Sequence, residues 1–226
     1  MPVRIMPETS PARRSVGILR LGAGTALVVA LGFQVVEQIL NNAMIAEQYF
    51  SYFTIQSSLI AATVLLIGGI SALRRSEDSV VYTVARTSVV AYAVVTAVVY
   101  NVLLRGIPTT GFHSTPWPGE LMHVWVPIFI VLDWLLSPGR PRLRWTALRI
   151  VVVYPLAWLA FTLARGAITG WYPYPFLEPS TGWLSVLIYV LGIAAFIVGL
   201  ASLAIAYGQW RARAGDGLSA LAPESL

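Results

Sequence analysis

The chain has 226 residues, of which 57% are apolar and only 11% are charged. A soluble domain of this size would carry about 25% charged residues, so the composition indicates an integral membrane protein. The absence of cysteine excludes a disulfide framework and a thiolate metal site, and the net charge of +5 comes from arginines scattered over short connections, which argues against a nucleic-acid partner.

Six apolar runs follow one another along the chain, each near the ~20 residues needed to cross about 30 Å of hydrocarbon. They are Val16–Ile39, Phe50–Leu73, Val80–Leu104, Gly119–Leu136, Trp145–Ile168 and Gly182–Tyr207. Because a backbone in lipid must satisfy its own hydrogen bonds, runs of this length form helices. We therefore predict an all-α, polytopic bundle of six transmembrane helices within residues 16–210, between a disordered tail at 1–15 and a second tail at 211–226.

The predicted topology depends on whether the first apolar run is retained as a helix and on which side of the membrane the arginines lie. Arginines precede the first run, as in a signal peptide, but the run is long and no small-residue cleavage motif closes it, so we predict a retained helix. Every arginine except Arg105 and Arg165 falls on the same side of the predicted bundle as the chain ends. The positive-inside rule then places both termini in the cytoplasm.

Polar side chains recur at helical spacing near the outer ends of five predicted helices. The stripes are Gln34, Glu37, Gln38 and Asn41; Thr54, Ser57 and Ser58; Asn101 and Arg105; Glu120 and His123; and Thr162, Arg165 and Thr169. Because lipid-facing polar groups are costly, we expect these faces to converge on an internal cavity that opens outward. Groups that merely join helices, each contributing about 0.6 kcal/mol, would be scattered in depth, so the common depth favours a site.

His123 lies about one turn inside the fourth predicted helix, where it is either functional or a buried histidine that hydrogen-bonds a neighbouring helix. With two histidines and no recognised metal-ligand spacing, we expect neither a metal site nor a cofactor. Charged residues within the helices need partners. We expect two ion pairs: Asp133 with Arg149 or Arg86, and Arg165 with Glu37 or Glu120.

The fifth connection, Thr169–Gly182, combines prolines with four aromatic residues. The prolines prevent a regular helix, and the aromatic side chains should hold the segment at the interface or over the bundle. We predict that it forms a lid or a cavity wall on the outer face.

Several segments together resemble one membrane-protein family. They are Phe50–Ser57, Val99–Gly106, His123-x3-Pro127, Leu132–Leu136 and Gly170–Leu177. They are similar to the bacterial branch of a six-helix family whose animal members are the androgen-induced and androgen-dependent transmembrane hydrolases. The similarity extends from Phe50 to about Gly182, and the aromatic fifth connection and the paired Thr and His positions are its most specific parts.

The resemblance implies an ester hydrolase in which Thr54 is the nucleophile and His123 is its base. Substrates in the animal branch are fatty acid esters of hydroxy fatty acids, and a bacterial member would lie in the inner membrane. The chain departs from the family at two positions, with Ser58 and Glu120 where asparagines are expected. Glu120 could orient the imidazole or alter its pKa.

We expect a substrate to be bound by residues of the outer polar layer. They are Asn101, Glu120, Arg165, Trp171 and Glu37, with Asn101, Arg165 or the Trp171 indole as alternatives for stabilising an oxyanion. The function predicted from the sequence is therefore hydrolysis of an amphiphilic acyl ester drawn from the lipid bilayer. The alternative is a membrane protein that binds or transports a small amphiphile without chemistry, although the chain shows no internal repeat typical of transporters. The oligomeric state is left open.

Overall fold

A computed structural model describes residues 9–107 and 112–221, with side chains up to residue 214. All regular structure in these ranges is helical, and six of the helices are long and apolar enough to cross a membrane. The six spans are Pro11–Leu40, Phe53–Arg74, Val80–Leu104, Pro116–Leu136, Trp145–Thr169 and Trp183–Ala214. The prediction of an all-α polytopic bundle with six transmembrane helices is confirmed.

The spans contain both long helices and short turns. The elements are α1 (Pro11–Leu40), α2 (Ala46–Tyr49), α3 (Phe53–Arg74), α4 (Val80–Val99), the π-helical turn η1 (Tyr100–Leu104), α5 (Pro116–Glu120), the π-helical turn η2 (Leu121–Trp125), α6 (Val126–Leu136), η3 (Trp145–Ala147), α7 (Leu148–Val151), α8 (Val153–Thr169), η4 (Pro175–Leu177), η5 (Pro179–Thr181) and α9 (Trp183–Leu221).

Two helices extend well beyond the predicted apolar runs. Helix α1 begins at Pro11, five residues before the predicted start, because the Ser10 side chain caps the helix and Pro11 occupies the first position. Helix α9 continues to Leu221, through most of the tail predicted at 211–226, and no proline interrupts it. The remaining tail residues, 1–8 and 222–226, lie outside the described residues.

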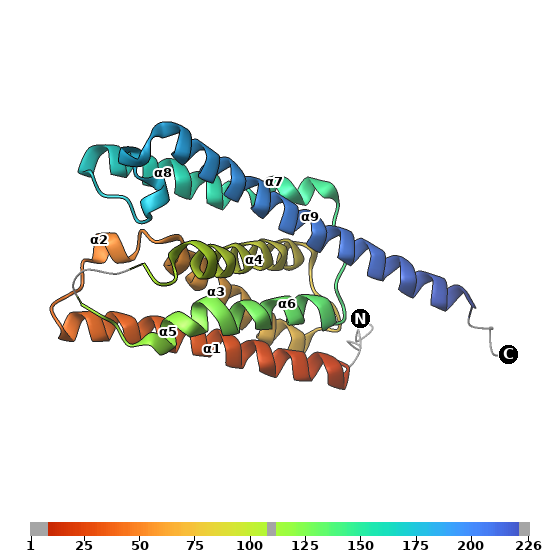
Figure 1. The fold of residues 1–226 in the computed structure, drawn as a ribbon. Coiled ribbons are helices and arrows are strands. Elements are labelled where there is room, and N and C mark those ends of the chain that lie inside the picture. The colour runs from red at the N-terminus through yellow and green to blue at the C-terminus, as the bar shows by residue number, and fades with distance from the viewer. Residues whose placement is uncertain (1–8, 108–111, 222–226) are drawn as a thin grey trace, which may run out of the picture.

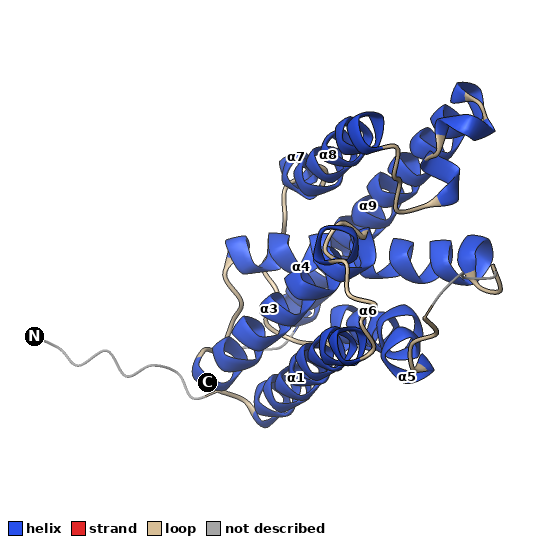
Figure 2. Ribbon diagram, turned by 90° about the vertical axis from the view of Figure 1, so that its left-hand side faces the viewer, coloured by secondary structure: helices blue, strands red, loops and turns tan. Residues whose placement is uncertain are grey.

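Helix α4 lies at the centre of the bundle. It packs against α3 and α6 on one side and against α7 and α9 on the other, while α1 lies against α3 (Figures 1 and 2). Helix α1 begins and α9 ends at the same end of the bundle. We call this the basic end, which includes residues 74–79, 137–146 and 208–214, and we call the opposite end, which includes residues 41–52, 112–119 and 170–182, the far end.

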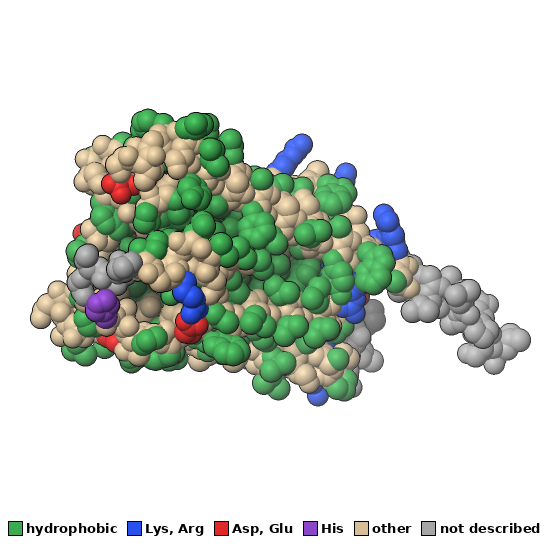
Figure 3. Space-filling view, in the orientation of Figure 1, with side chains coloured by type: hydrophobic (Ala, Val, Ile, Leu, Met, Phe, Trp, Pro, Cys, Tyr) green, Lys and Arg blue, Asp and Glu red, His purple; other side chains and the backbone are tan. Residues whose placement is uncertain are grey.

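Small residues allow α1 and α3 to approach closely. A Cβ atom at Gly69 would lie 2.6 Å from the Leu21 side chain and 2.9 Å from the Gly17 carbonyl oxygen. Such contacts are typical of helix pairs in membranes, where van der Waals packing replaces the hydrophobic effect between helices. On the face shown in Figure 3, hydrophobic side chains are spread along the flank, and most of the visible arginine side chains lie toward the basic end.

A buried network of charges joins the helices at the basic end. It comprises Arg13, Arg20, Asp78, Arg86, Asp133 and Ser137, which we call the arginine–aspartate cluster. Asp78 accepts from Arg13 at 2.9 Å and from Arg86 at 2.8 Å, and Asp133 accepts from Arg20 at 2.9 Å and from Arg86 at 2.6 Å. These bonds connect α1, α4, α6 and the α3–α4 connection. Because buried charges must be paired, the cluster fixes how these elements meet.

Of the two alternative partners predicted for Asp133, the structure uses Arg86. The pair with Arg86 is confirmed, whereas Arg149 is exposed and forms no ion pair with Asp133 in the described structure. Arg20, in the third turn of α1 and 0% exposed, is a second partner of Asp133 that was not predicted from the sequence.

Candidate active site

Thr54 and His123 meet at the far end of the bundle. Thr54 is in the first turn of α3, His123 is in the η2 turn, and Oγ1 of Thr54 lies 3.5 Å from Nε2 of His123. Both side chains are half-buried. A nucleophile and a base need to be within hydrogen-bond reach, and this separation is typical of the looser geometry found before a substrate binds.

The backbone assigns the tautomer of His123. Its Nδ1 atom lies 2.8 Å from the carbonyl oxygen of Gly119, one turn earlier in the chain. A carbonyl oxygen only accepts hydrogen bonds, so Nδ1 must carry the proton. The lone pair of Nε2 then faces the Thr54 hydroxyl, as a general base requires.

Pro127 explains how His123 is held. Proline has no N–H, so the carbonyl of residue 123 has no donor four residues later in its own helix. The side-chain amide of Asn101 supplies that bond, donating to the His123 carbonyl at 3.2 Å and to the Ala97 carbonyl at 2.8 Å. Asn101 therefore positions the histidine, and its amide is not directed at the Thr54 hydroxyl as an oxyanion donor would be.

Two π-helical turns face each other at this point, η1 carrying Tyr100 and η2 carrying His123. The two rings are stacked, with centroids 3.7 Å apart and an interplanar angle of 14°. A π-helical turn inserts one extra residue per turn and so changes the direction of the side chains that follow; such turns are frequent at functional sites. The two irregular turns place both rings against each other.

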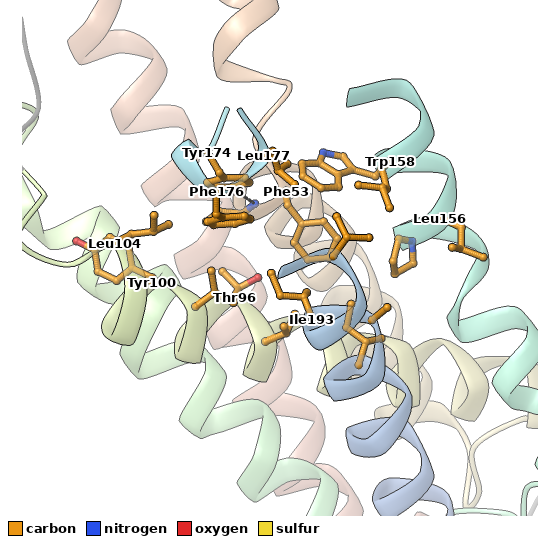
Figure 4. A pocket seen from close by; sticks show the side chains of 18 residues that line it. Phe53, Thr96, Tyr100, Leu104, Leu156, Trp158, Tyr174, Phe176, Leu177 and Ile193 are labelled. Atoms are coloured by element: carbon orange, nitrogen blue, oxygen red, sulfur yellow. Dashed lines mark hydrogen bonds between the residues drawn. The ribbon is translucent and has the colours of Figure 1, made fainter. Parts of the chain in front are cut away.

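An apolar cavity of about 100 Å³ lies on the other side of Thr54. It is bounded by α3, α4, α8, α9 and the fifth connection, and its walls include Phe53, Trp158 and Ile193 (Figure 4). Leu156, also in its wall, is 56% exposed, so the cavity reaches the flank of the bundle that faces lipid. Thr54 is thus placed between a histidine base and an apolar compartment.

The fifth connection closes the cavity at the far end, which confirms the predicted cavity wall. Leu177 is 2% exposed, and Tyr174 and Phe176 are stacked with centroids 5.2 Å apart (Figure 4). The Tyr174 hydroxyl accepts a hydrogen bond from the backbone N–H of Thr54 at 3.4 Å, satisfying a donor that the first turn of α3 leaves open. Burial raises the pKa of Tyr174 to about 12, so its phenol stays protonated at neutral pH.

Three predicted binding residues lie elsewhere. Glu37 accepts hydrogen bonds from the backbone N–H and the hydroxyl of Thr115. Arg165 donates to the Ser51 hydroxyl at 2.8 Å, and its guanidinium lies over the Trp171 ring at 4.7 Å. None of the three contacts Thr54 or His123 or lines the cavity in the described structure.

The predicted ion pair of Arg165 with Glu37 or Glu120 is wrong. Glu120 instead pairs with Arg105 at 2.9 Å, across the gap between η1 and α5, and both side chains are more than a third exposed. Arg105 also donates to the Asn101 side chain at 2.8 Å. The imidazole is oriented by Gly119 rather than by Glu120.

Three residues of this site were not predicted from the sequence: Tyr100, Gly119 and Tyr174. Tyr174 had a detectable signal, because it lies in the aromatic connection already expected to form a wall. Gly119 acts through its carbonyl oxygen, which every residue type possesses, and Tyr100 depends on two π-helical turns. Neither contribution has a sequence pattern of its own.

No group of three or more His, Asp or Glu side chains within residues 9–107 and 112–214 is arranged to hold a metal ion. Comparisons with protein-family models, with curated proteins and with solved structures found no match to this chain.

Proposed function

We propose that this chain is an integral membrane hydrolase that cleaves lipid-like carboxylic esters, with Thr54 as the nucleophile and His123 as the base. The observation that carries the proposal is the 3.5 Å approach of Thr54 Oγ1 to the unprotonated Nε2 of His123, next to an apolar cavity. A threonine hydroxyl is a weak nucleophile until a neighbouring base takes its proton. The cavity, open to lipid through its wall, suits an acyl chain such as that of a fatty acid ester of a hydroxy fatty acid.

Apart from water, the reaction uses only Thr54, His123 and the Gly119 carbonyl. The Thr54 oxygen attacks the ester carbonyl while His123 Nε2 takes the hydroxyl proton. The tetrahedral intermediate then expels the alcohol, which leaves with that proton, and an acyl ester remains on Thr54. Water, deprotonated by His123, attacks this ester and releases the carboxylic acid, and the proton returns to Thr54. The Gly119 carbonyl stabilises the imidazolium by accepting from Nδ1–H throughout.

Tyr174 is the group best placed to stabilise the oxyanion. The Tyr174 hydroxyl oxygen accepts from the Thr54 N–H. The hydroxyl hydrogen of Tyr174 is therefore free to donate to the oxyanion that forms when Thr54 attacks the ester. The N-terminal turn of α3 adds open N–H groups and the positive end of the helix dipole. Removal of one oxyanion donor lowers kcat by about 100- to 1000-fold, so we expect such a loss for Tyr174→Phe, which keeps the aromatic packing.

The test uses purified protein in detergent, a long-chain ester reporter and an electrophilic ester mimic that acylates the nucleophile. Thr54→Ala and His123→Ala should each abolish turnover, and the double variant should be no slower than either single variant, because the pair acts as a unit. Thr54→Ser should retain part of the activity. Thr63→Ala is the matched control, since Thr63 is an exposed threonine of the same helix whose hydroxyl bonds the Leu59 carbonyl.

Adduct formation that persists in Thr54→Ala would remove the threonine from the mechanism. Binding of the ester without turnover in the native protein would instead favour the second candidate, a protein that holds an amphiphile. The apolar walls of the cavity support that candidate equally well. Transport has less support, because the arginine–aspartate cluster closes the basic end with paired charges rather than an open polar path.

We further propose that the chain lies in a bacterial inner membrane with the basic end in the cytoplasm, since arginines concentrate there. A cysteine at exposed Ser180, at the far end, should react with an impermeant thiol reagent applied to intact cells, whereas a cysteine at exposed Arg75 should react only after lysis. The native chain has no cysteine, so all labelling of this protein comes from the introduced residue. The opposite labelling pattern would show that the protein has the opposite orientation in the membrane, with Thr54 and His123 on the cytoplasmic side.

A further inference from the structure

A second hollow lies at the basic end, remote from Thr54 and His123. It is an open cleft of about 490 Å³ between α9 and the α6–η3 connection. Its lining includes three arginines, Arg142, Arg144 and Arg213, together with Trp145, Thr146 and Gln209. The described lining contains no acidic side chain.

The walls of the cleft are held by specific bonds. The Gln209 amide donates to the Leu143 carbonyl at 2.8 Å, and Arg211 donates to the Leu135 carbonyl at 2.5 Å, so both bonds join α9 to the chain around the α6–η3 connection. Beneath them Leu143 packs with Ile205, which is 1% exposed. The arginines are therefore presented on a fixed surface rather than on a loose tail.

Positive charge is in excess around the cleft. Neither Arg144 nor Arg213 forms an ion pair with any residue that the structure describes. The neighbouring Arg140 has a pKa lowered to about 10, first by burial and then by the charges of Arg86 and Arg211. Arg140 does not line the cleft, but its lowered pKa shows that cations are crowded close to it. The three arginines of the lining, with no acidic side chain among them, favour an anionic ligand.

The position of the cleft indicates which kind of anion it would bind. Trp145 and Trp210, at the ends of two membrane spans, are 51% and 62% exposed, as interfacial tryptophans are. Between such residues the cleft lies at the level of lipid headgroups, where phosphates are the abundant anions. We propose that this cleft binds the headgroup phosphate of an anionic phospholipid, with Arg144 and Arg213 donating to its oxygens and Trp145 packing along the lipid.

This inference is independent of the proposed hydrolysis. The purified full-length protein is titrated in detergent with phosphatidylglycerol, phosphatidylcholine or inorganic phosphate, while thermal unfolding and lipid retention in native mass spectrometry are measured. Phosphatidylglycerol should raise the melting temperature and remain bound, and phosphatidylcholine should do neither. One arginine near an anionic headgroup changes affinity about fivefold, so Arg144→Gln with Arg213→Gln should weaken phosphatidylglycerol binding by about 25-fold.

The matched control is Arg74→Gln with Arg75→Gln, which removes two exposed arginines from the same end outside the cleft. It should keep the native affinity. Equal weakening in both double variants would mean that only general charge attracts the lipid, and unchanged binding in the cleft variant would exclude these two arginines; either result overturns the proposal. Equal stabilisation by inorganic phosphate would assign the cleft to a soluble anion and overturn its assignment to lipid.

Discussion

The two ends of the bundle treat polar groups in opposite ways. At the basic end, three arginines and two aspartates are each at most 8% exposed at the side chain and are joined by short, charge-assisted bonds. At the far end, Thr54 and His123 approach to 3.5 Å, remain half-buried and adjoin an apolar cavity. A fully paired cluster leaves nothing to bind a ligand and serves the fold, whereas a loosely paired one beside a cavity is available for chemistry.

The comparison also separates two uses of the same residue type. Arg20 and Arg86 are buried and bind carboxylates, while Arg105 at the far end pairs with Glu120 in an exposed bridge. An exposed ion pair is weakened by water and salt. Removal of one member of a buried pair leaves the other charge buried without a partner, which strongly destabilises the fold. Four substitutions test this contrast, in order of expected effect.

Asp78→Asn should have the largest effect. Asp78 is completely buried and binds Arg13 and Arg86, so its neutralisation leaves three arginines with a single carboxylate. Breaking a buried pair in this way costs about 3–5 kcal/mol. We expect a strong fall in folded yield and melting temperature in detergent. Glu77→Gln, the same chemical change at the exposed neighbouring residue, should leave both unchanged. A stable Asp78→Asn protein would contradict a structural role for the cluster.

Asn101→Ala should act on activity rather than on folding. The Asn101 amide donates to the His123 carbonyl and so takes the place of the N–H that Pro127 lacks. Displacement of a catalytic group by about 1 Å can cost up to ~100-fold in rate, so ester turnover should fall by an amount of this order with little change in melting temperature. Asn41→Ala, which removes another amide bonded to a helix carbonyl at the far end, is the control. Equal activity in the two variants would remove Asn101 from the site.

Arg165→Ala should lower the free energy of unfolding by about 1 kcal/mol, because it removes one hydrogen bond to Ser51 and one contact with the face of Trp171. This is far less than the loss of a buried ion pair, which was the expectation when Glu37 or Glu120 was its predicted partner. The melting temperature measures it, with Arg149→Ala in the same span as the exposed control. A loss as large as that of Asp78→Asn would show an acidic partner.

Glu120→Gln should have the smallest effect. The Glu120–Arg105 bridge is exposed, and the imidazole is oriented by the Gly119 carbonyl instead. Melting temperature and ester turnover should both stay within experimental error of the native protein, at low and at high salt. A marked shift in the pH profile of turnover would instead place the Glu120 carboxylate in electrostatic contact with His123.

The sequence by itself determined the six helices, because a bilayer leaves an apolar run of this length no other way to satisfy its backbone. The depth of the polar residues likewise brought Thr54 and His123 to one layer, and the family resemblance singled them out as a pair. Pro127, visible in the sequence, already implied that the His123 carbonyl would need a donor from outside its own helix.

Only the tertiary structure decided which donor and which partners were used. The rotation of each helix about its axis depends on packing, including the close contact at Gly69 and the two π-helical turns at Tyr100 and His123. Those rotations turned Arg165 away from both glutamates and brought Arg20 to Asp133. Depth along a helix follows from counting residues, but the direction in which a side chain points is set by the neighbouring helices, and so the ion pairs required the three-dimensional structure.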